Sequence, residues 1–323
     1  MADAEPTLNP AQQRVLDVLG ATPSERPTFR SDLAEHLRAE LEAWFVDIIG
    51  EPEQPFRVSK HTLSSVHGCE EQFLAERAAP FETTVRIAVG TVAHKAIELS
   101  QHWGTDANAA DLVDAALQRV SESDIWLTGW LAGCGEGETA ELRALSNERV
   151  AKFLESFPPL QRRWRPVTEN RLRAEFAGGK LVVEGKVDLV IGRTRGNVAG
   201  KVFVDFKTGG STATHTDDLR LYGLLETLRL GVPPRMLASY YLDQGRLIPE
   251  EVSEQLLEAA ARRLIDGVQK VVDLLEVRRS PTRRPGPACR WCLLAATCDD
   301  GQRYLAGQRD PYEAAYVDDL DGE

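Results

Sequence analysis

Two largely apolar runs, residues 180–191 and 201–207, carry polar residues at every second position over 184–188 and 205–207. Both runs are rich in valine, leucine and phenylalanine, which suit a pleated, half-buried surface. Residues 192–200 between them contain three glycines and an asparagine, the residues that favour turns. The pattern predicts two strands joined by a loop.

Three charged residues on this predicted hairpin can converge. Because side chains alternate along a strand, Asp205 and Lys207 are expected on one face of the second strand, with Asp188 across from them on the first. Two carboxylates beside one ammonium group could hold Mg²⁺ or Mn²⁺ and orient an attacking water. The alternative is a half-solvated hairpin with an ordinary surface ion pair.

Apolar residues recur at helical spacing over much of the remaining chain. Residues 167–176, which carry Glu169, are predicted to form a strand, and residues 236–242 a further strand. Residues 104–160 are helical in character but poorly patterned. The predicted helices span residues 11–19, 31–49, 59–77, 83–103, 217–230 and 250–277.

The order helix, three strands, helix, strand predicts an α/β fold, a mixed central sheet flanked by helices. We expect a helical N-terminal extension over residues 1–56, a main domain over 57–300 and an acidic tail over 301–323. Prolines at 281, 285 and 287 interrupt the chain before its last cysteines.

The 323 residues carry a formal net charge of −12, which at first argues against a nucleic-acid partner. Residues 1–60 and 299–323 together account for −11 of that charge, so the rest of the chain is nearly neutral. Arginine next to an aromatic residue suits the phosphates and bases of a single strand, although a solvated surface is the alternative. The candidates are Arg162, Arg163 and Arg165 around Trp164, and Arg283 and Arg284 before Trp291.

The first ten residues have neither a basic start nor an apolar core, so we expect no secretory signal, no membrane partner and a cytoplasmic location. In a reducing compartment, five cysteines suggest metal binding rather than disulfides. Each Gly-Lys pair is followed by leucine or valine instead of serine or threonine, so the phosphate loop of ATPases is missing.

Two further groups of residues contain possible metal ligands. Gly90, His94 and Glu98 are spaced by four and share a helix face, although a lone histidine is usually structural. The C-x2-C-x5-C group of Cys289, Cys292 and Cys298 can turn toward one centre.

Cys69, 220 residues before Cys289, would complete a set of four and tie the two ends of the domain together. Buried apolar cysteines and a zinc site remain the alternatives to an iron–sulfur cluster.

Five segments in this order resemble the PD-(D/E)XK nuclease superfamily, in particular RecB-type nucleases with an iron–sulfur cluster, such as the C-terminal part of AddB and CRISPR-associated exonucleases. The segments are Cys69 to Phe73, Gly90 to His94, Gly185 to Asp188, Asp205 to Lys207 and the terminal cysteine triplet.

The resemblance implies a restriction-endonuclease-like core in which His94, Asp188 and Asp205, with the carbonyl of Phe206, hold the metal and Lys207 positions the water. The family often has an acidic residue on the strand before the hairpin, and the resemblance places Glu169 at that position as a candidate catalytic residue. It also implies that Cys69, Cys289, Cys292 and Cys298 ligate a structural 4Fe–4S cluster.

One position departs from this family. Its next helix typically carries glutamine and, four residues on, tyrosine, whereas this chain has Asp218 and Tyr222. Tyr222 fits a catalytic role, but the carboxylate of Asp218 replaces an amide and could alter strand binding or activity.

The resemblance therefore predicts a Mg²⁺- or Mn²⁺-dependent DNA exonuclease that prefers single strands and acts in repair, recombination or defence. The alternative is a non-catalytic DNA-binding subunit of a helicase–nuclease complex. In either case residues 1–56 could dock a helicase or another protein.

Overall fold

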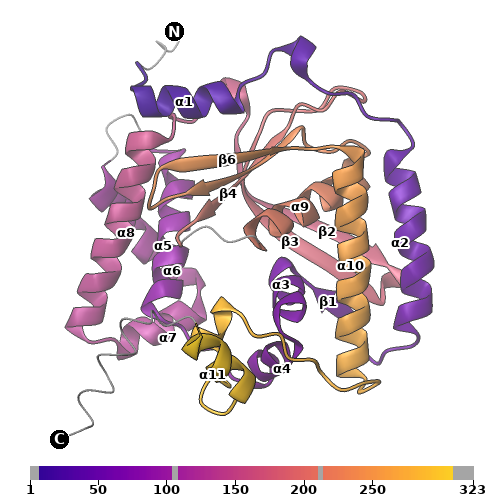
Figure 1. The fold of residues 1–323 in the computed structure, drawn as a ribbon. Helices are drawn as coiled ribbons and strands as arrows, with labels where there is room; N and C mark the ends of the chain where they lie inside the picture. Colours follow the sequence, from indigo (N-terminus) through magenta and orange to yellow (C-terminus); the bar gives the residue numbers. More distant parts are fainter. Residues whose placement is uncertain (1–6, 104–107, 210–213, 308–323) are drawn as a thin grey trace, which may run out of the picture.

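The computed structural model describes residues 7–103, 108–209 and 214–307. Residues 308–323 of the predicted acidic tail therefore lie outside the described residues, and residues 301–306 belong to a helix. A six-stranded mixed sheet forms the centre of the described chain, with helices on both faces (Figure 1). The predicted fold class is confirmed.

The sheet has the order β1-β3-β4-β5-β6, and β2 pairs with the other side of β3. β1 runs parallel to β3 and β4 runs parallel to β5, whereas the remaining neighbours are antiparallel. The strands are β1 (Phe56–Val58), β2 (Val167–Phe176), β3 (Leu181–Ile191), β4 (Val202–Lys207), β5 (Met236–Tyr241) and β6 (Arg246–Glu251).

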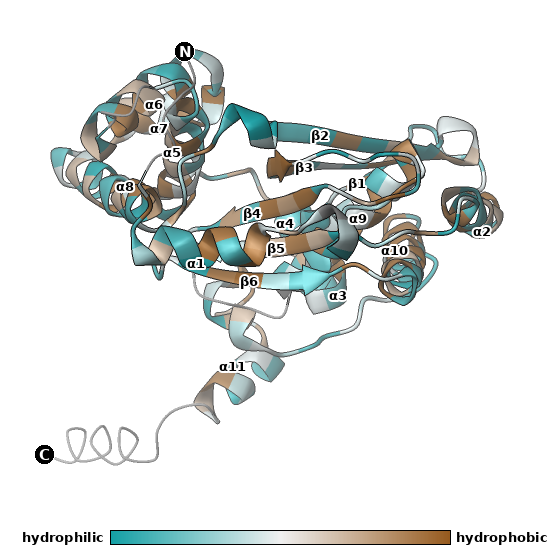
Figure 2. Cartoon of the chain, turned by 90° about the horizontal axis from the view of Figure 1, so that it is seen from above, coloured by the Kyte–Doolittle hydropathy of each residue, from teal (hydrophilic) through white to brown (hydrophobic). Residues whose placement is uncertain are grey.

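Each face of the sheet is covered by its own group of helices. One core cluster joins the sheet to α2, α9 and α10, and a second joins it to α5, α6 and α8. Figure 2 shows β4 and β5 as largely hydrophobic strands within this arrangement. The helices are α1 (Pro10–Leu19), α2 (Leu33–Ile49), α3 (Lys60–Gly68), α4 (Glu70–Ala78), α5 (Val85–Ser100), α6 (Ala109–Ser123), α7 (Ile125–Gly133), α8 (Glu136–Ser156), α9 (Thr214–Leu230), α10 (Glu254–Leu275) and α11 (Asp299–Ala306).

The predicted hairpin is confirmed as β3 and β4. Val204 and Phe206 pack in the core cluster shared with α5 and α8, so the residues between them face the other side of β4. Because side chains alternate along β4, Asp205 and Lys207 lie on the same face of the strand, as the pattern predicts.

Two predicted helices differ from the structure, and some short elements were not predicted. The helix predicted over residues 59–77 is two helices, because the backbone of Cys69 is extended (φ −150°, ψ 119°) and separates α3 from α4. The helix predicted from Glu250 begins at Glu254, since residues 246–251 form β6. The three-residue β1 and the terminal α11 were not predicted.

The helical extension is closely joined to the main fold. Leu33, Leu37 and Leu41 on α2 are fully buried in the cluster that contains β2, β3 and α10. None of the helices in the described part of the chain combines the length and the apolar run that crossing a bilayer requires.

Candidate functional site

The site lies where β3 and β4 separate. Pairing between these strands ends at Leu189 and Val204, while β1 pairs with β3 only as far as Val183. Asp188, which directly precedes Leu189 in β3, accepts a hydrogen bond at Oδ2 from the backbone N–H of Phe206 (2.7 Å). A carboxylate thus takes the place of the missing strand partner.

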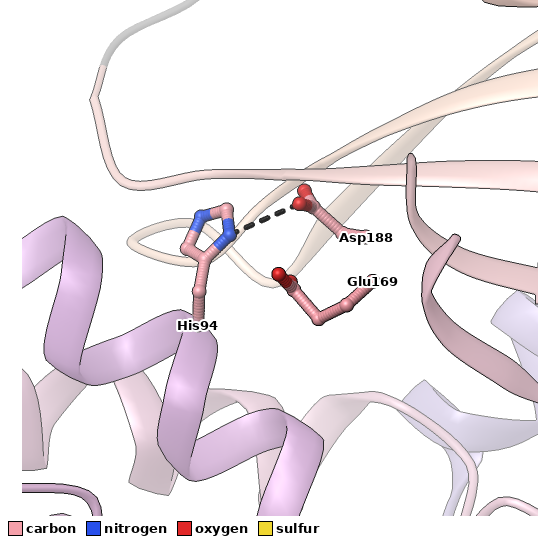
Figure 3. Close-up of side chains that lie close together, drawn as sticks. All are labelled: His94, Glu169 and Asp188. Atoms are coloured by element: carbon pink, nitrogen blue, oxygen red, sulfur yellow. Dashed lines mark hydrogen bonds and ion pairs between the residues drawn. The ribbon is translucent and has the colours of Figure 1, made fainter. Parts of the chain in front are cut away.

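Three potential metal ligands meet beside this separation. His94 on α5, Glu169 on β2 and Asp188 on β3 each offer one ligand atom, and these atoms lie within 4.8 Å of one another (Figure 3). His94 Nδ1 lies 3.1 Å from Asp188 Oδ1. One imidazole and two carboxylates form a donor set that accepts Mg²⁺ or Mn²⁺.

The backbone of Glu169 is held in an unusual conformation. Its φ of 53° is left-handed, which is uncommon for a residue other than glycine. Thr168 pairs with Leu189 and Asn170 with Val187, so Glu169 faces Asp188 directly. Two carboxylates opposite each other repel, and among the described residues the ion pair of Glu169 with Lys186 and the contact of His94 with Asp188 offset the repulsion. A bound cation would offset it further.

The nearby carboxylates change the pKa of His94. Burial by itself lowers the pKa of an imidazole, but the charge and hydrogen bond of Asp188, helped by Asp205 and Glu169, raise the pKa of His94 above its ordinary value. The site therefore favours positive charge at the position that the three ligands surround.

Asp205 lies outside the 4.8 Å group because its carboxylate is held by two lysines. Lys60 Nζ donates to Oδ1 at 3.3 Å, and Lys207 Nζ lies 2.6 Å from Oδ2. Burial opposes ionisation, but Lys60 and Lys207 outweigh it and keep the pKa of Asp205 below its usual range. Among the described residues, Oδ2 has no partner with hydrogen-bond angles, so this oxygen could accept a metal. Its role as a ligand stays a prediction.

Lys207 is shared between two carboxylates. Its Nζ lies 3.5 Å from Asp218 Oδ2 in addition to the contact with Asp205. Burial raises the pKa of Asp218, although Lys207 and Lys60 act against this effect. The residue that departs from the family pattern is therefore in direct contact with the predicted catalytic lysine.

Lys60 was not identified from the sequence. It lies in the first turn of α3, where the helix dipole disfavours a cation, and this is the one sequence signal that could have identified it. Its Nζ lies 5.4 Å from the centre of the Tyr222 ring. Burial lowers the pKa of a lysine, but Asp205 and Tyr222 more than offset this and raise the pKa of Lys60.

Tyr222 is only 1% exposed and reaches the site because residue 185 is a glycine. A Cβ on Gly185 would lie 2.2 Å from Tyr222 Cε1. We expect Gly185→Ala to destabilise the protein by about 1–3 kcal/mol through overpacking, and to displace Tyr222 from Lys60. Thermal unfolding measures the effect. The control is Gly129→Ala on α7, where a Cβ meets nothing within 4 Å; equal melting temperatures for the two variants would contradict the prediction.

A cleft of about 720 Å³ opens next to the ligand group. His94 and Glu169 form part of its wall, together with the cations Lys95, Arg171 and Lys186. Gly90 and Glu98 also line it, as their shared helix face predicts. At the cleft, Trp126 is 57% exposed and contacts Phe81 edge-on, with ring centres 5.6 Å apart.

The two predicted arginine groups lie in different surroundings. Arg162 and Arg163 form a single 3-10 turn and Arg165 follows it, just before β2. Arg283 lies 3.6 Å from Glu71, and Arg284 donates to the carbonyl of His67 at 3.3 Å. The second group therefore makes contacts within the protein, and DNA binding by either group stays a prediction.

The four cysteines at the ends of the main domain line one pocket. Cys69 comes from the junction of α3 and α4, and Cys289, Cys292 and Cys298 come from the segment before α11. Three of the sulfurs accept backbone N–H groups at 3.4 Å, from Gly286, Leu294 and Gly301. The fifth cysteine, Cys134, ends α7 and is not part of this pocket.

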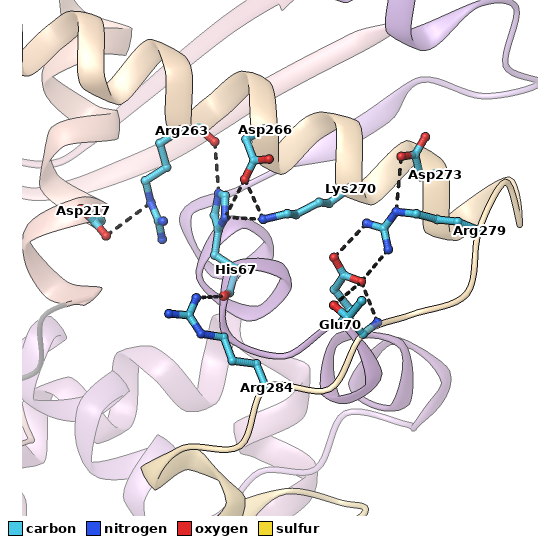
Figure 4. A network of polar contacts seen from close by, with 10 residues as sticks. His67, Glu70, Asp217, Arg263, Asp266, Lys270, Asp273, Arg279 and Arg284 are labelled. Atoms are coloured by element: carbon cyan, nitrogen blue, oxygen red, sulfur yellow. Dashed lines mark hydrogen bonds and ion pairs between the residues drawn. The ribbon is translucent and has the colours of Figure 1, made fainter. Parts of the chain in front are cut away.

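Residues next to Cys69 hold the C-terminal segment in place (Figure 4). Glu70, 5% exposed, accepts two hydrogen bonds from Arg279, at 2.6 and 2.8 Å. It also accepts from the backbone and hydroxyl of Thr282, at 2.8 and 2.9 Å. Arg279 and Thr282 lower the pKa of Glu70 to about 2 despite its burial. This ion pair brings the two ends of the domain together.

His67 in the same network is expected to make the protein sensitive to mild acid. Burial, with Arg263 and Lys270 nearby, lowers its pKa to about 4, so the folded state disfavours the protonated ring. The unfolded chain takes up the proton first, so stability falls as pH decreases from about 6.5 toward 4, by up to about 2 kcal/mol at pH 5. His67→Gln should reduce the loss of melting temperature between pH 7.5 and 5. The exposed His61→Gln should not, and identical pH profiles for all three proteins would contradict this prediction.

Comparison with known proteins identifies the family of the chain. No curated protein sequence matches the chain. Among solved structures, it is similar to a protein named SSO0001, with 14% identity, coverage of 83% of this chain and 97% of that chain, and a TM-score of 0.32. It is also similar to a Eubacterium rectale protein described as a "putative exonuclease", with 12% identity, coverage of 88% and 94%, and a TM-score of 0.46. The family model of the PD-(D/E)XK nuclease superfamily matches residues 57–299. The chain belongs to the PD-(D/E)XK nuclease superfamily.

Proposed function

We propose that this nuclease hydrolyses phosphodiester bonds of single-stranded DNA with Mg²⁺ or Mn²⁺, as an exonuclease of the RecB type. The observation that carries the proposal is the convergence of His94, Glu169 and Asp188 beside Lys207. When bound there, the ion would stabilise negative charge on the phosphate and make water a better nucleophile.

The residues of the chain have separable tasks in this reaction. His94, Glu169 and Asp188 would hold the ion, and Asp205 is a further candidate ligand if a metal shares its Oδ2 with Lys207, whose Nζ lies 2.6 Å away. Lys207, fixed by Asp205, would hold the attacking water through a proton of its ammonium group. Lys60 would keep Asp205 ionised and, with Tyr222, restrict the position of Lys207.

The cleft supports a single strand as substrate. Arg171 supplies positive charge for a phosphate backbone, whereas Lys95 and Lys186 are already paired with Glu98 and Glu169. The exposed rings of Trp126 and Phe81 offer faces on which bases can stack. Stacking needs unpaired bases, which a single strand provides.

We also propose an iron–sulfur cluster at the four cysteines. In a tetrahedral zinc site, sulfurs about 2.3 Å from the metal lie about 3.8 Å from one another. Among the described residues, no three cysteine sulfurs lie within 4.8 Å of one another, so the spacing favours a larger centre. Backbone N–H groups pointing at three sulfurs suit such a cluster. Iron and acid-labile sulfide in the purified protein would support the cluster, and one zinc would contradict it.

Incubation of the purified protein with end-labelled single- and double-stranded DNA tests the proposed activity. With Mn²⁺ the wild type should shorten the single strand from an end, and EDTA should stop it. Lys207→Ala should lower the rate by about 10²–10⁴-fold, because the attacking water loses its orienting group. Lys180→Ala, which removes an exposed lysine from the start of β3, should not. A wild type that cuts nothing, or a Lys207→Ala protein that cuts normally, would contradict the proposal.

Asp218 motivates the second candidate, a non-catalytic DNA-binding subunit that docks a helicase or another protein through residues 1–56. Asp218 competes with the attacking water for Lys207, from which it lies 3.5 Å. If the wild type binds single strands without cutting them and Asp218→Gln restores cutting, this candidate is favoured.

A further inference from the structure

A second cavity, of about 460 Å³, lies at the opposite end of β4 from Lys207. Its walls come from the end of α1, the turn before β2 and the loop between β3 and β4. Among the described residues that line it there is no carboxylate. Six arginines line it: Arg26, Arg163, Arg165, Arg193, Arg195 and Arg235.

This cavity is separate from the cleft beside His94. The two share no lining residue among those described. Gly200 lines the arginine cavity, and Asp205 lies five residues further along the chain, which corresponds to about 16 Å in an extended strand. The arginines therefore cannot serve the scissile phosphate directly.

Three of the arginines in the cavity are poorly neutralised by the described part of the protein. Among the described residues, no carboxylate forms an ion pair with Arg165, Arg193 or Arg195, although the chain as a whole carries a net charge of −12. Their mutual repulsion, with Arg26, lowers the pKa of Arg193. Burial and Arg26 lower the pKa of Arg235, although Glu25 and Glu251 act against them. Gathering like charges costs free energy unless an anion binds among them.

The loop that carries Arg193 and Arg195 is held in one conformation. The backbone N–H of Ala199 donates to Pro27 at 2.9 Å, and that of Phe29 donates to Asn197 at 3.2 Å. Gly192 and Gly200 approach so closely that a Cβ on Gly192 would lie 2.2 Å from the carbonyl oxygen of Gly200. The site is thus formed before any ligand arrives.

One guanidinium in the cavity also has an unmet hydrogen bond. Arg26 Nε is buried and has no hydrogen-bond partner among the described residues. Gly200 makes room for this side chain, because a Cβ there would lie 3.3 Å from Arg26 Nη1. A buried donor without a partner is costly, and an acceptor bound in the cavity would satisfy it.

We propose that this cavity binds the phosphate of a nucleotide unit, with the base against Trp164. Guanidinium groups bind phosphate through paired hydrogen bonds, and an indole ring can stack a base. The volume lies within the usual range for small-molecule sites, and Leu16, Leu19 and Ile191 supply apolar walls. The nucleotide can belong to the DNA strand beyond the cut site, in which case the inference rests on the proposed function, or it can be a free mononucleotide.

Binding of a labelled single-stranded oligonucleotide in EDTA tests the inference without hydrolysis. The test variant is the double substitution Arg193→Ala with Arg195→Ala, both on the exposed loop. The control is Arg119→Ala with Arg246→Ala, which removes the same charge from exposed positions outside the cavity. Competition by a deoxynucleoside monophosphate, with inorganic phosphate alongside, separates the two sources of the nucleotide.

If the strand occupies the cavity, the loop variant should bind the oligonucleotide at least about tenfold more weakly than the control, with a shallower salt dependence. If a free nucleotide occupies it, the monophosphate should bind the wild type and the control but not the loop variant. Equal binding by the loop variant and the control in both arms would overturn the inference, as would a wild type that binds neither ligand. If the wild type binds the oligonucleotide or the monophosphate more tightly than the loop variant does but never cuts DNA, the proposed function is contradicted and the inference about the cavity is not.

Discussion

Asp188→Asn is expected to lower hydrolysis of single-stranded DNA by on the order of 10³-fold or more. Oδ1 of Asp188 faces His94 and its Oδ2 accepts the N–H of Phe206, so this one carboxylate links the ligand group to the start of the strand separation. Asparagine has the same shape and can still accept from Phe206, but it removes the negative charge that a divalent ion requires. The substitution should therefore lower the rate of hydrolysis without lowering the stability of the fold.

Rates of cutting, measured beside thermal unfolding, separate these two effects. The variant should unfold within a few degrees of the wild type and should still bind DNA in EDTA. Asp243→Asn, on an exposed residue in the turn before β6, is the matched control and should cut normally. Cutting by Asp188→Asn within about threefold of the wild-type rate would show that the ligand group is not used.

Cys289→Ser is expected to reduce the yield of soluble, folded protein sharply. The four cysteines come from segments 220 residues apart, and a metal centre that closed so long a loop would restrict the unfolded chain by about 5 kcal/mol in the chain-entropy model. Because proteins are stable by only about 5–15 kcal/mol, a loss of this size leaves little margin. Soluble yield, iron content and thermal unfolding measure the effect.

Cys134→Ser provides the control for this variant, since Cys134 ends α7 outside the cysteine pocket. It should leave yield, iron content and melting temperature unchanged. A Cys289→Ser protein that keeps the wild-type melting temperature would contradict a structural role. If that protein were well folded but inactive, a redox role would be indicated instead.

The parts of the fold that were predicted correctly are those with regular periodicity. In β3 and β4, polar residues recur at every second position over residues 184–188 and 205–207, so the common face of Asp205 and Lys207 followed from the pattern. β6 was missed because Pro249 and two glutamates resemble the start of the following helix. The break at Cys69 was missed because no proline marks it, and the helix pattern continues on both sides.

The site could be predicted only in part, for a physical reason. Short motifs identify His94, Asp188 and Lys207, but the contact of Lys60 with Asp205 joins residues 145 positions apart and has no local signal. The positive φ of Glu169, which aims its carboxylate at Asp188, is likewise set by the neighbouring strand. The arginine cavity depends on five separate segments of the chain, so the cluster of Arg162, Arg163 and Arg165 alone could not reveal it.

Titration of Mn²⁺ into the purified protein, followed by electron paramagnetic resonance, tests the central claim most directly, because the signal of free Mn²⁺ falls as the ion binds. The claim is that His94, Glu169 and Asp188 together hold a divalent ion. The account predicts saturable binding to the wild type that Asp188→Asn abolishes. A wild type that binds no Mn²⁺, or an Asp188→Asn protein that binds it equally well, would contradict the account.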